Sequence, residues 1–314
     1  MKTHVFFIMK LPSFFGLVGL LAVIPAAVAD DLSVGNIADL SADKDKVRIS
    51  HEFSADYGYV GGARTYSGNL RFGDVEEQSN HLNYVLAPQI EKRVILRFGV
   101  DWQRFSFSLP NNTPLPNRLQ STALVVGGDF MLSDQWLLRV ETQPGVYSDF
   151  QDISSRDFNS PVVFGGAYLV DEHLQWFFGL SVDTFRHFPV IPVVGARWKF
   201  ADEWTLMFIL PKPRLEYELD KNIILYAGGE LKGGTYRVGE NFGDPFFRSE
   251  LNNAMVDYTE GRIGVGSGWK LTPSLTLDVE GGYMVYREFD FHRSATRIKS
   301  DPAPYGQAAV SMKF

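Results

Sequence analysis

Residues 46–60 read KVRISHEFSADYGYV, and polar and apolar side chains alternate along the whole stretch. Every second position from Val47 to Tyr57 is apolar except His51, and the positions between them, such as Arg48 and Glu52, are polar. Successive side chains of a β-strand point to opposite faces. This repeat therefore predicts a strand with one apolar and one polar side.

The same two-residue repeat returns at intervals to the end of the chain. It is clearest at 93–103, 136–143, 174–182, 204–210 and 275–280, and we find no helical repeat of useful length. Aromatic residues make up 14% of the chain, and its mean hydropathy is only -0.09. Apolar residues spread singly along strands are typical of a membrane barrel. The sequence predicts an all-β fold: a single up-and-down antiparallel transmembrane β-barrel.

The connections between these strands are of two kinds. The tight ones are polar and are each followed at once by a new strand: Glu91-Lys92, Ser133-Asp134-Gln135, Asp171-Glu172-His173, Ala201-Asp202-Glu203, Asp220-Lys221-Asn222 and Thr272-Pro273-Ser274. The others lie near 60–80, 109–119, 148–160, 185–190, 211–213, 234–254 and 289–303. Six tight turns that alternate with seven other connections join 14 strands, with 12 as the alternative.

An even strand number places both termini on one side of the membrane. Short turns face the periplasm in such barrels, so we expect periplasmic N- and C-termini. A soluble β-sandwich would show no fixed order of short and long connections. A β-propeller would repeat every 40–50 residues or so, and no such repeat is visible. Both soluble folds are therefore disfavoured.

The N-terminus has the pattern of a secretory signal peptide over residues 1–29. Lys2 and Lys10 supply the charged start, residues 11–24 are apolar, and Ala27 and Ala29 form a small-x-small cleavage motif. An uncleaved membrane anchor is the alternative, but the apolar run is short for a spanning helix. We expect a short periplasmic lead over 30–45 and the barrel over 46–314, in the outer membrane of a Gram-negative bacterium.

The chain ends in YGQAAVSMKF, in which Gly306, Val310, Met312 and Phe314 share one face. A terminal aromatic with apolar residues at every second position resembles the signal read by the outer-membrane assembly machinery. The last strand would pair with an edge of that machinery by β-augmentation. An ordinary last strand that ends in Phe is the alternative. The expected partners are outer-membrane lipid and this machinery.

The polar faces of the predicted strands carry both signs of charge in nearly equal number. We expect a lumen charge network of Arg48, Glu52, Arg93, Arg97, Asp101, Arg139, Glu141, Arg197, Arg214, Glu216, Glu218, Glu230, Asp278 and Glu280. An ion-selective pore would show one sign in excess at a constriction. A balanced set instead predicts ion pairs that brace or narrow the lumen, because unpaired buried charges cost several kcal/mol each. Whether a conduit remains is left open.

Aromatic residues gather close to the tight turns: Trp136, Trp176, Trp198, Phe200 and Trp204. Tryptophan prefers the membrane interface, where its ring can be half solvated. The cluster predicts a periplasmic aromatic girdle, with the core of a soluble fold as the alternative.

Signals for catalysis or for a cofactor are weak. The chain has no cysteine, and no two of its 6 histidines have the spacing of metal ligands. His51 falls on an apolar face, which suggests an interface histidine or, alternatively, a catalytic base facing lipid. We predict no enzyme activity, no cofactor and no metal. The pI of about 5.4 argues against nucleic acid as a partner.

One segment resembles a known family. It includes Trp198-Lys199-Phe200, the stretch LPKPRLEY at 210–217 and Gly233-Gly234-Thr235-Tyr236, and the likeness extends to Gly282-Tyr283 and Arg287-Glu288-Phe289. These elements resemble a family of outer-membrane β-barrels of unknown function, domain of unknown function 6268. The resemblance implies an outer-membrane location. It implies no substrate and no catalytic residue.

Three functions are compatible with this fold. The leading hypothesis is porin-like passage of small solutes, or a structural barrel with a charge-filled lumen. The first alternative is a binding or adhesion barrel that works through 60–80, 234–254 and 289–303. The second alternative is an outer-membrane hydrolase.

Overall fold

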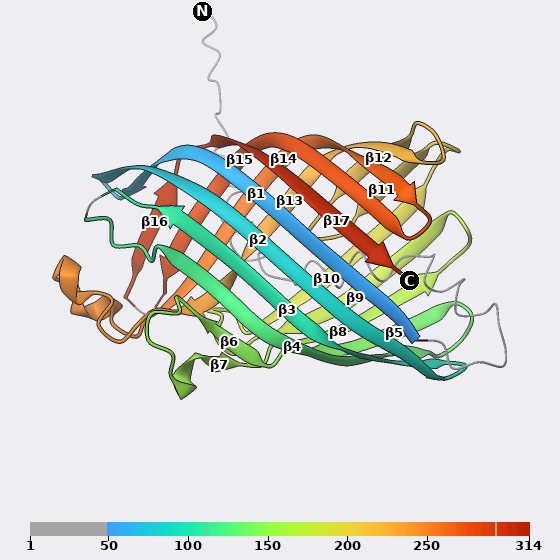
Figure 1. Cartoon of the computed structure of the whole chain (residues 1–314), viewed down its shortest axis with the longest axis horizontal. Helices are drawn as coiled ribbons and strands as arrows, with labels where there is room; N and C mark the ends of the chain where they lie inside the picture. Colours follow the sequence, from blue (N-terminus) through green and yellow to red (C-terminus); the bar gives the residue numbers. More distant parts are fainter. Residues whose placement is uncertain (1–48, 111, 293) are drawn as a thin grey trace, which may run out of the picture.

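The computed structural model describes residues 49–110, 112–292 and 294–314, which form one antiparallel β-sheet closed on itself (Figure 1). The strands are β1 (Ile49–Ser67), β2 (Leu70–Glu91), β3 (Val94–Ser108), β4 (Arg118–Met131), β5 (Trp136–Thr142), β6 (Gly145–Ser148), β7 (Phe158–Asn159), β8 (Val162–Leu169), β9 (Leu174–Val182), β10 (Val190–Lys199), β11 (Trp204–Phe208), β12 (Arg214–Glu218), β13 (Ile223–Arg237), β14 (Met255–Thr272), β15 (Leu275–Phe291), β16 (Thr296–Ser300) and β17 (Ala303–Lys313). Three single-turn 3₁₀-helices lie in loops: η1 (Ser155–Asp157), η2 (Asp244–Phe246) and η3 (Ser249–Leu251). Within the described residues, no helix is long and apolar enough to cross a membrane.

The 17 segments form 14 barrel strands, because three strands are each interrupted at a proline. Pro144 separates β5 from β6, Pro161 separates β7 from β8, and Pro302 separates β16 from β17. Proline has no N–H to donate to a ladder, so the pairing breaks there and resumes beyond it. β17 pairs with β1 over Glu52 to Val60 and closes the barrel. The predicted closed antiparallel barrel of 14 strands is confirmed.

The two ends of the barrel differ in their connections, as predicted. The six short polar turns all lie at one end, which we call the tight-turn end. Both ends of the described chain lie there too, because the backbone N–H of His51 donates to the Phe314 carbonyl at 2.7 Å. Figure 1 shows the C-terminus at this end, opposite the end with the longer connections, which we call the loop end.

Two of the predicted long loops are wrong. Residues 60–80 are mostly strand, because β1 runs to Ser67, turns at Gly68 and Asn69, and continues as β2. Near 289–303, β15 extends to Phe291 and β16 begins at Thr296. These stretches lose the polar-apolar alternation, yet their backbone groups still pair across the ladder, because every backbone donor and acceptor needs a partner. The predicted loop at 234–254 is real but shorter, spanning 238–254.

The side chains are sorted as in a membrane barrel, with apolar groups outside and charges inside. Outward-facing Phe208 and Val265 are 66% and 65% exposed, whereas the inward Arg139 is 2% exposed. The predicted aromatic girdle lies outside near the tight turns, where Trp136 packs on Tyr168 with ring centroids 4.7 Å apart. Trp204 packs on Tyr217 in the same way, at 4.9 Å. This arrangement suits a ring of interfacial aromatics at the tight-turn end.

The barrel wall is uneven in height. β1 and β2 have 19 and 22 residues, whereas β11 and β12 have 5 each (Figure 1). β13 pairs with β12 only as far as Gly228, and Pro211 and Pro213 extend the contact to Leu231. From Lys232 to Tyr236, no described strand pairs with this edge of β13. We call this interruption the wall gap.

Candidate functional site

A packed apolar cluster closes the barrel interior at the loop end. Its members come from the inner faces of β2, β3, β4 and β13 to β16, and from loops 109–117 and 238–254: Val75, Phe105, Phe107, Leu115, Leu119, Tyr236, Val238, Leu251, Ala254, Val256, Tyr258, Phe289, Phe291 and Ile298. We call this cluster the apical core. Its rings pack edge to face, with the Phe105 and Tyr258 centroids 4.8 Å apart. Packing of this kind leaves few voids large enough for water.

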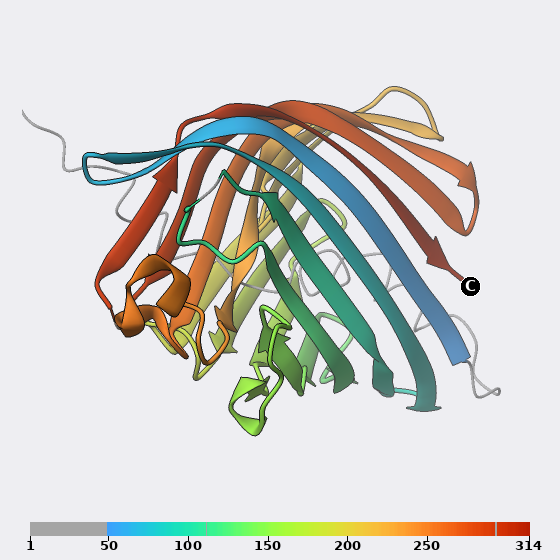
Figure 2. The same ribbon diagram turned by 60° about the vertical axis from the view of Figure 1, so that its left-hand side comes forward.

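Loop 238–254 contributes to this closure. Leu251, in η3, is fully buried in the apical core, and Phe242 stacks on Phe291 at 6.1 Å. The loop is anchored to its neighbour, because the N–H of Gly239 donates to the Asp149 carboxylate at 2.9 Å. In Figure 2 this loop is the orange segment with coiled ribbons at the loop end.

A buried salt cluster lies against the apical core. Glu77 of β2 and Glu260 of β14 alternate with Arg262 of β14 and Arg287 of β15, and all four side chains have no exposed surface. Arg287 Nη2 lies 2.7 Å from a carboxylate oxygen of each glutamate. Tyr258 also donates to Glu260 at 2.9 Å. Two carboxylates and two guanidiniums cancel in charge, so the desolvation cost of each ion is offset by its partners.

The sequence interpretation missed all four ions of this salt cluster. Glu77 falls within the stretch 60–80 that was predicted as a loop, and Arg287 lies beyond the part of β15 where the alternation is clear. The spacing of Glu260 and Arg262, two apart, could have revealed one face of a strand. Their pairing with Glu77 depends on the register of distant strands, and no local pattern encodes it.

Five other charged residues form a second network, nearer the tight-turn end. Arg97 lies 2.9 Å from Glu52 and 3.1 Å from Glu141. Arg139 makes a bidentate contact with Asp129, at 2.6 and 2.7 Å. Four of these residues were predicted to line the lumen, and the structure brings them together.

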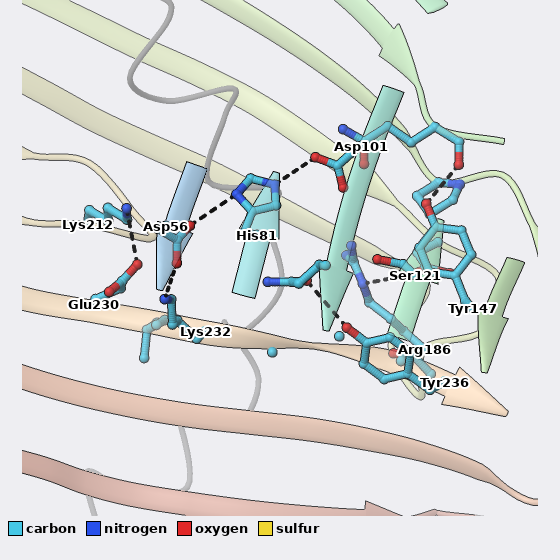
Figure 3. Close-up of a pocket in the computed structure, with 18 residues that line it drawn as sticks. Asp56, His81, Asp101, Ser121, Tyr147, Arg186, Lys212, Glu230, Lys232 and Tyr236 are labelled. Carbon is cyan, nitrogen blue, oxygen red and sulfur yellow. Dashed lines mark hydrogen bonds and ion pairs between the residues drawn. The ribbon is translucent and has the colours of Figure 1, made fainter. Parts of the chain in front are cut away.

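A chain of polar contacts continues through the middle of the lumen. His81 lies between Asp101, at 2.7 Å, and Asp56, at 3.2 Å (Figure 3). Lys232 Nζ lies 3.0 Å from Asp56, and Lys212 Nζ lies 3.2 Å from the predicted Glu230. These contacts join β1, β2, β3 and β13, so predicted and unpredicted residues form one continuous polar interior.

The remaining predicted lumen residues are scattered. Arg214 and Glu216 pair at 3.1 Å, and Glu280 accepts a hydrogen bond from Tyr305. Arg197 and Asp278 are half-buried on the inner wall, and Glu218 is exposed at the tight-turn end.

Arg93 is a correction to the predicted network. It lies in a tight turn with 59% of its side chain exposed, 3.8 Å from Asp134, and so it does not line the lumen. The alternation was extended one residue too far into the turn. Arg48, the cleavage motif at Ala27 and Ala29, and the lead at 30–45 lie outside the described residues.

A polar cavity of about 100 Å³ lies beside the wall gap (Figure 3). Its lining includes the polar contacts around His81 in the middle of the lumen and the edge of β13. The lining residues are Asp56, His81, Asp101, Gln103, Ser121, Gln143, Tyr147, Pro161, Asp183, Arg186, Lys212, Glu230, Leu231, Lys232, Gly233, Gly234, Thr235 and Tyr236. We call it the lumen cavity. One water needs about 10–15 Å³ of such a volume, so the cavity has room for several waters or a small solute.

Loop 183–189, which we call the strap, forms one side of this cavity and reaches across to the outer face of β13 and β14. Arg237 lies over the Phe185 ring at 5.5 Å. The backbone N–H of His187 donates to the outward-facing Asp257 carboxylate at 3.3 Å. The rings of His187 and His292 are 5.3 Å apart. These contacts hold the strap across the wall gap.

Polar side chains also connect the cavity with the tight-turn end. Gln143 lines the cavity and donates to Glu141 at 3.2 Å. Glu141 contacts Arg97, and Arg97 contacts Glu52, which lies 3.7 Å from the half-exposed Lys313. A chain of polar contacts therefore runs from the cavity to the tight-turn end of the lumen.

His51 has the packing role that the sequence suggested as one of two possibilities. Its ring faces outward, stacks on the Phe314 ring at 5.1 Å and contacts the Tyr84 hydroxyl at 2.8 Å. A tyrosine and a C-terminal aromatic are not the partners of a catalytic base, which needs a nucleophile within reach. Within 49–110, 112–292 and 294–314, no group of three or more His, Cys, Asp or Glu side chains could hold a metal ion.

Solved barrels of similar architecture include an outer membrane channel from Pseudomonas putida F1. It shares 12% identity with this chain, covers 87% of it and 98% of its own length, and has a TM-score of 0.44. A deletion mutant of the TodX monoaromatic hydrocarbon channel shares 7% identity over 88% of this chain and 92% of that one, with a TM-score of 0.46. A Pseudomonas aeruginosa FadL homologue shares 9% identity over 95% of this chain and 96% of its own length, with a TM-score of 0.37.

Likeness at this level describes barrel architecture, and we transfer no function from it. No curated protein matches the sequence. The family model for a domain of unknown function (DUF6268) matches residues 89–303, more than half of the chain. This is the family that the segment around 198–236 resembles, and the chain belongs to it.

Proposed function

We propose that this protein is an outer-membrane barrel that passes small polar solutes and is closed in the conformation described. In this proposal the tight-turn end, with both chain ends, faces the periplasm and the loop end faces outward, as in other bacterial barrels. The outward-facing apolar side chains and the aromatic girdle support membrane insertion. The last strand, with Phe314 at its end, would be the segment that the assembly machinery recognises by strand addition.

The observation that carries the proposal is the lumen cavity and its polar connection to the tight-turn end. A purely structural barrel could fill its interior with apolar side chains, as the apical core does. Here the interior instead keeps a polar cavity that adjoins a line of charged side chains ending at Lys313. Such a lining can replace the water of a small polar solute at each step.

The route to this cavity does not follow the barrel axis. The apical core blocks the axis at the loop end, because its rings and methyl groups pack against one another there and are at most 5% exposed. The lumen cavity lies instead beside the wall gap, where the strap supplies Asp183 and Arg186 to its lining. We propose that displacement of the strap opens the cavity to the outside.

Solute uptake into proteoliposomes tests the proposal. A cavity of about 100 Å³ should admit erythritol and exclude the much larger sucrose, so wild-type protein should accelerate erythritol uptake alone. Liposomes without protein give the background. If erythritol uptake stays at that background, passage is refuted and the charge-filled lumen is structural.

A second candidate, ligand binding at the loops, rests on a separate observation. Residues of loops 109–117, 149–152 and 239–246 line an open cavity of about 440 Å³, with Leu115, Phe242 and Asp149 among them. Of the three stretches proposed for adhesion, only 234–254 contributes to it. Phe246→Ser should abolish binding of a hydrophobic fluorescent dye if this cavity takes ligands, whereas exposed Phe247→Ser should leave dye binding unchanged.

A further inference from the structure

Arg186 has an incomplete set of partners inside the lumen cavity. Its side chain is 5% exposed, Nη2 donates to the Ser181 hydroxyl at 2.9 Å, and Nε lies 3.3 Å from the Asp183 carboxylate. Nη1 is buried, and no acceptor in the described part of the chain hydrogen-bonds to it. Burial lowers the pKa of the Arg186 guanidinium below its usual value, and Asp183 only partly opposes this. Nη1 is therefore the nitrogen of this guanidinium that neither Ser181 nor Asp183 contacts.

The carboxylates that line the cavity already accept hydrogen bonds or ion pairs from other groups. Asp56 accepts from Lys232, and Glu230 pairs with Lys212. Asp101 contacts both His81 and Asn83. Asp183 accepts from Asn159 at 2.7 Å as well as pairing with Arg186. The lining thus satisfies its carboxylates and leaves Arg186 Nη1 without an acceptor, which a molecule bound in the cavity can supply.

We propose that the lumen cavity binds a small carboxylate solute, with a carboxylate oxygen accepting a hydrogen bond from Arg186 Nη1. Hydrogen bonds between ions are stronger than those between neutral groups, so a carboxylate suits this donor better than an amide does. The size of the cavity, about 100 Å³, limits the solute to a molecule of a few carbon atoms, and acetate is the simplest carboxylate of this kind. This inference rests on the proposed function and names the class of solute that would pass.

Equilibrium binding of acetate to the detergent-solubilised full chain tests the site. Saturation-transfer NMR measures this binding. Acetamide has the same shape without the charge and is the matched probe. We expect acetate to bind wild-type protein roughly tenfold more tightly than acetamide does, the loss that one charge-assisted hydrogen bond would cause. Arg186→Gln should weaken acetate binding by a similar factor and leave acetamide binding unchanged.

Two further variants keep the test decisive. Arg156→Gln removes an exposed loop arginine and should bind acetate like wild type. If Arg186→Gln does not fold, Arg186→Lys keeps the charge but has one donor nitrogen in place of three, and it should bind acetate with reduced affinity. Failure of wild type to bind acetate, or equal acetate affinity in wild type and the Arg186 variants, overturns the proposal.

The two proposals fail separately. Erythritol uptake without acetate binding would refute the carboxylate site and retain the passage. Acetate binding that depends on Arg186, without uptake of any solute, would retain the site and refute the passage.

Discussion

At the scale of single residues, the interior is organised by exact pairing of buried charges. Glu77, Glu260, Arg262 and Arg287 have no contact with solvent, and each ion touches at least two groups of opposite charge or hydrogen-bonding character. Removing one ion leaves its partners buried with a net charge. The resulting loss of folding free energy is larger than the stabilisation that the intact pair contributes.

The first prediction concerns Glu77→Gln, which keeps the size of the side chain and removes its charge. The salt cluster then holds two guanidiniums against one carboxylate. We expect the free energy of unfolding to fall by about 3–5 kcal/mol, the usual cost of breaking a buried pair. Urea unfolding in lipid vesicles, followed by tryptophan fluorescence, measures the change.

Glu172→Gln is the matched control, because it makes the same change on a side chain that is 86% exposed in a tight turn. It should leave the unfolding transition essentially where it is. Equal stabilities for the Glu77 variant and wild type would show that the salt cluster is not the brace described here.

A second prediction uses Asp149, which lies in a loop and accepts hydrogen bonds from the N–H groups of Gly239 and Gln151. Burial raises the pKa of Asp149, despite these hydrogen bonds. A raised folded-state pKa gives a stability contribution that is complete below the unfolded pKa, roughly 4, and is lost as the pH rises through the folded value. Asp149→Asn should therefore gain stability relative to wild type as the pH rises from about 4 towards neutrality. Urea unfolding across this range measures the difference, and a constant difference contradicts it.

The sequence predicted charged residues only where the alternation on their own strand was clear. Arg97, Arg139 and Glu141 lie in such stretches, and they do face the lumen. Glu77 lies where β2 extends beyond the part with an apolar outer face, and its partners are on β14 and β15. Strand register across the sheet decides those pairs, and a single sequence does not encode it locally.

At the scale of elements, the height of each strand sets the shape of the lumen. The alternation predicted all six tight turns, because each lies between two apolar strands. The alternation did not predict the parts of β1, β2 and β15 at the loop end. A strand needs no lipid-facing apolar pattern where it extends beyond the membrane. The short β11 and β12 leave the β13 edge without a neighbouring strand from Lys232 to Tyr236, and the strap compensates for it.

A third prediction concerns loop 238–254, which completes the apical core. The N–H of Asn253 donates to the Gly239 carbonyl at 3.1 Å, so the two ends of the loop are close together. Replacing residues 240–252 with a two-glycine turn should leave the barrel folded but remove Leu251 and Phe242 from the core. We expect the variant to conduct ions in planar bilayers under conditions where wild type is nearly silent. Unchanged conductance would show that other residues close the loop end.

At the scale of the whole molecule, the barrel combines a closed axis with a polar cavity beside the wall gap. Composition and the spacing of turns predicted the closed barrel and its 14 strands. They did not predict the cavity, because it is formed by Asp56, Arg186 and Lys232 from three distant segments. The folded register brings these residues together.

The strap is therefore the element on which passage depends, and a cross-link across it tests this directly. The chain has no cysteine, so the double variant His187→Cys, His292→Cys has a single pair of cysteines. They replace two histidines whose ring centroids are 5.3 Å apart. The measurement is erythritol uptake by proteoliposomes before and after treatment with a short bis-maleimide. We expect the double variant to take up erythritol like wild type before treatment and at the protein-free background after it, and we expect treated wild type to be unaffected. Uptake that continues unchanged through the cross-linked protein would contradict entry beneath the strap.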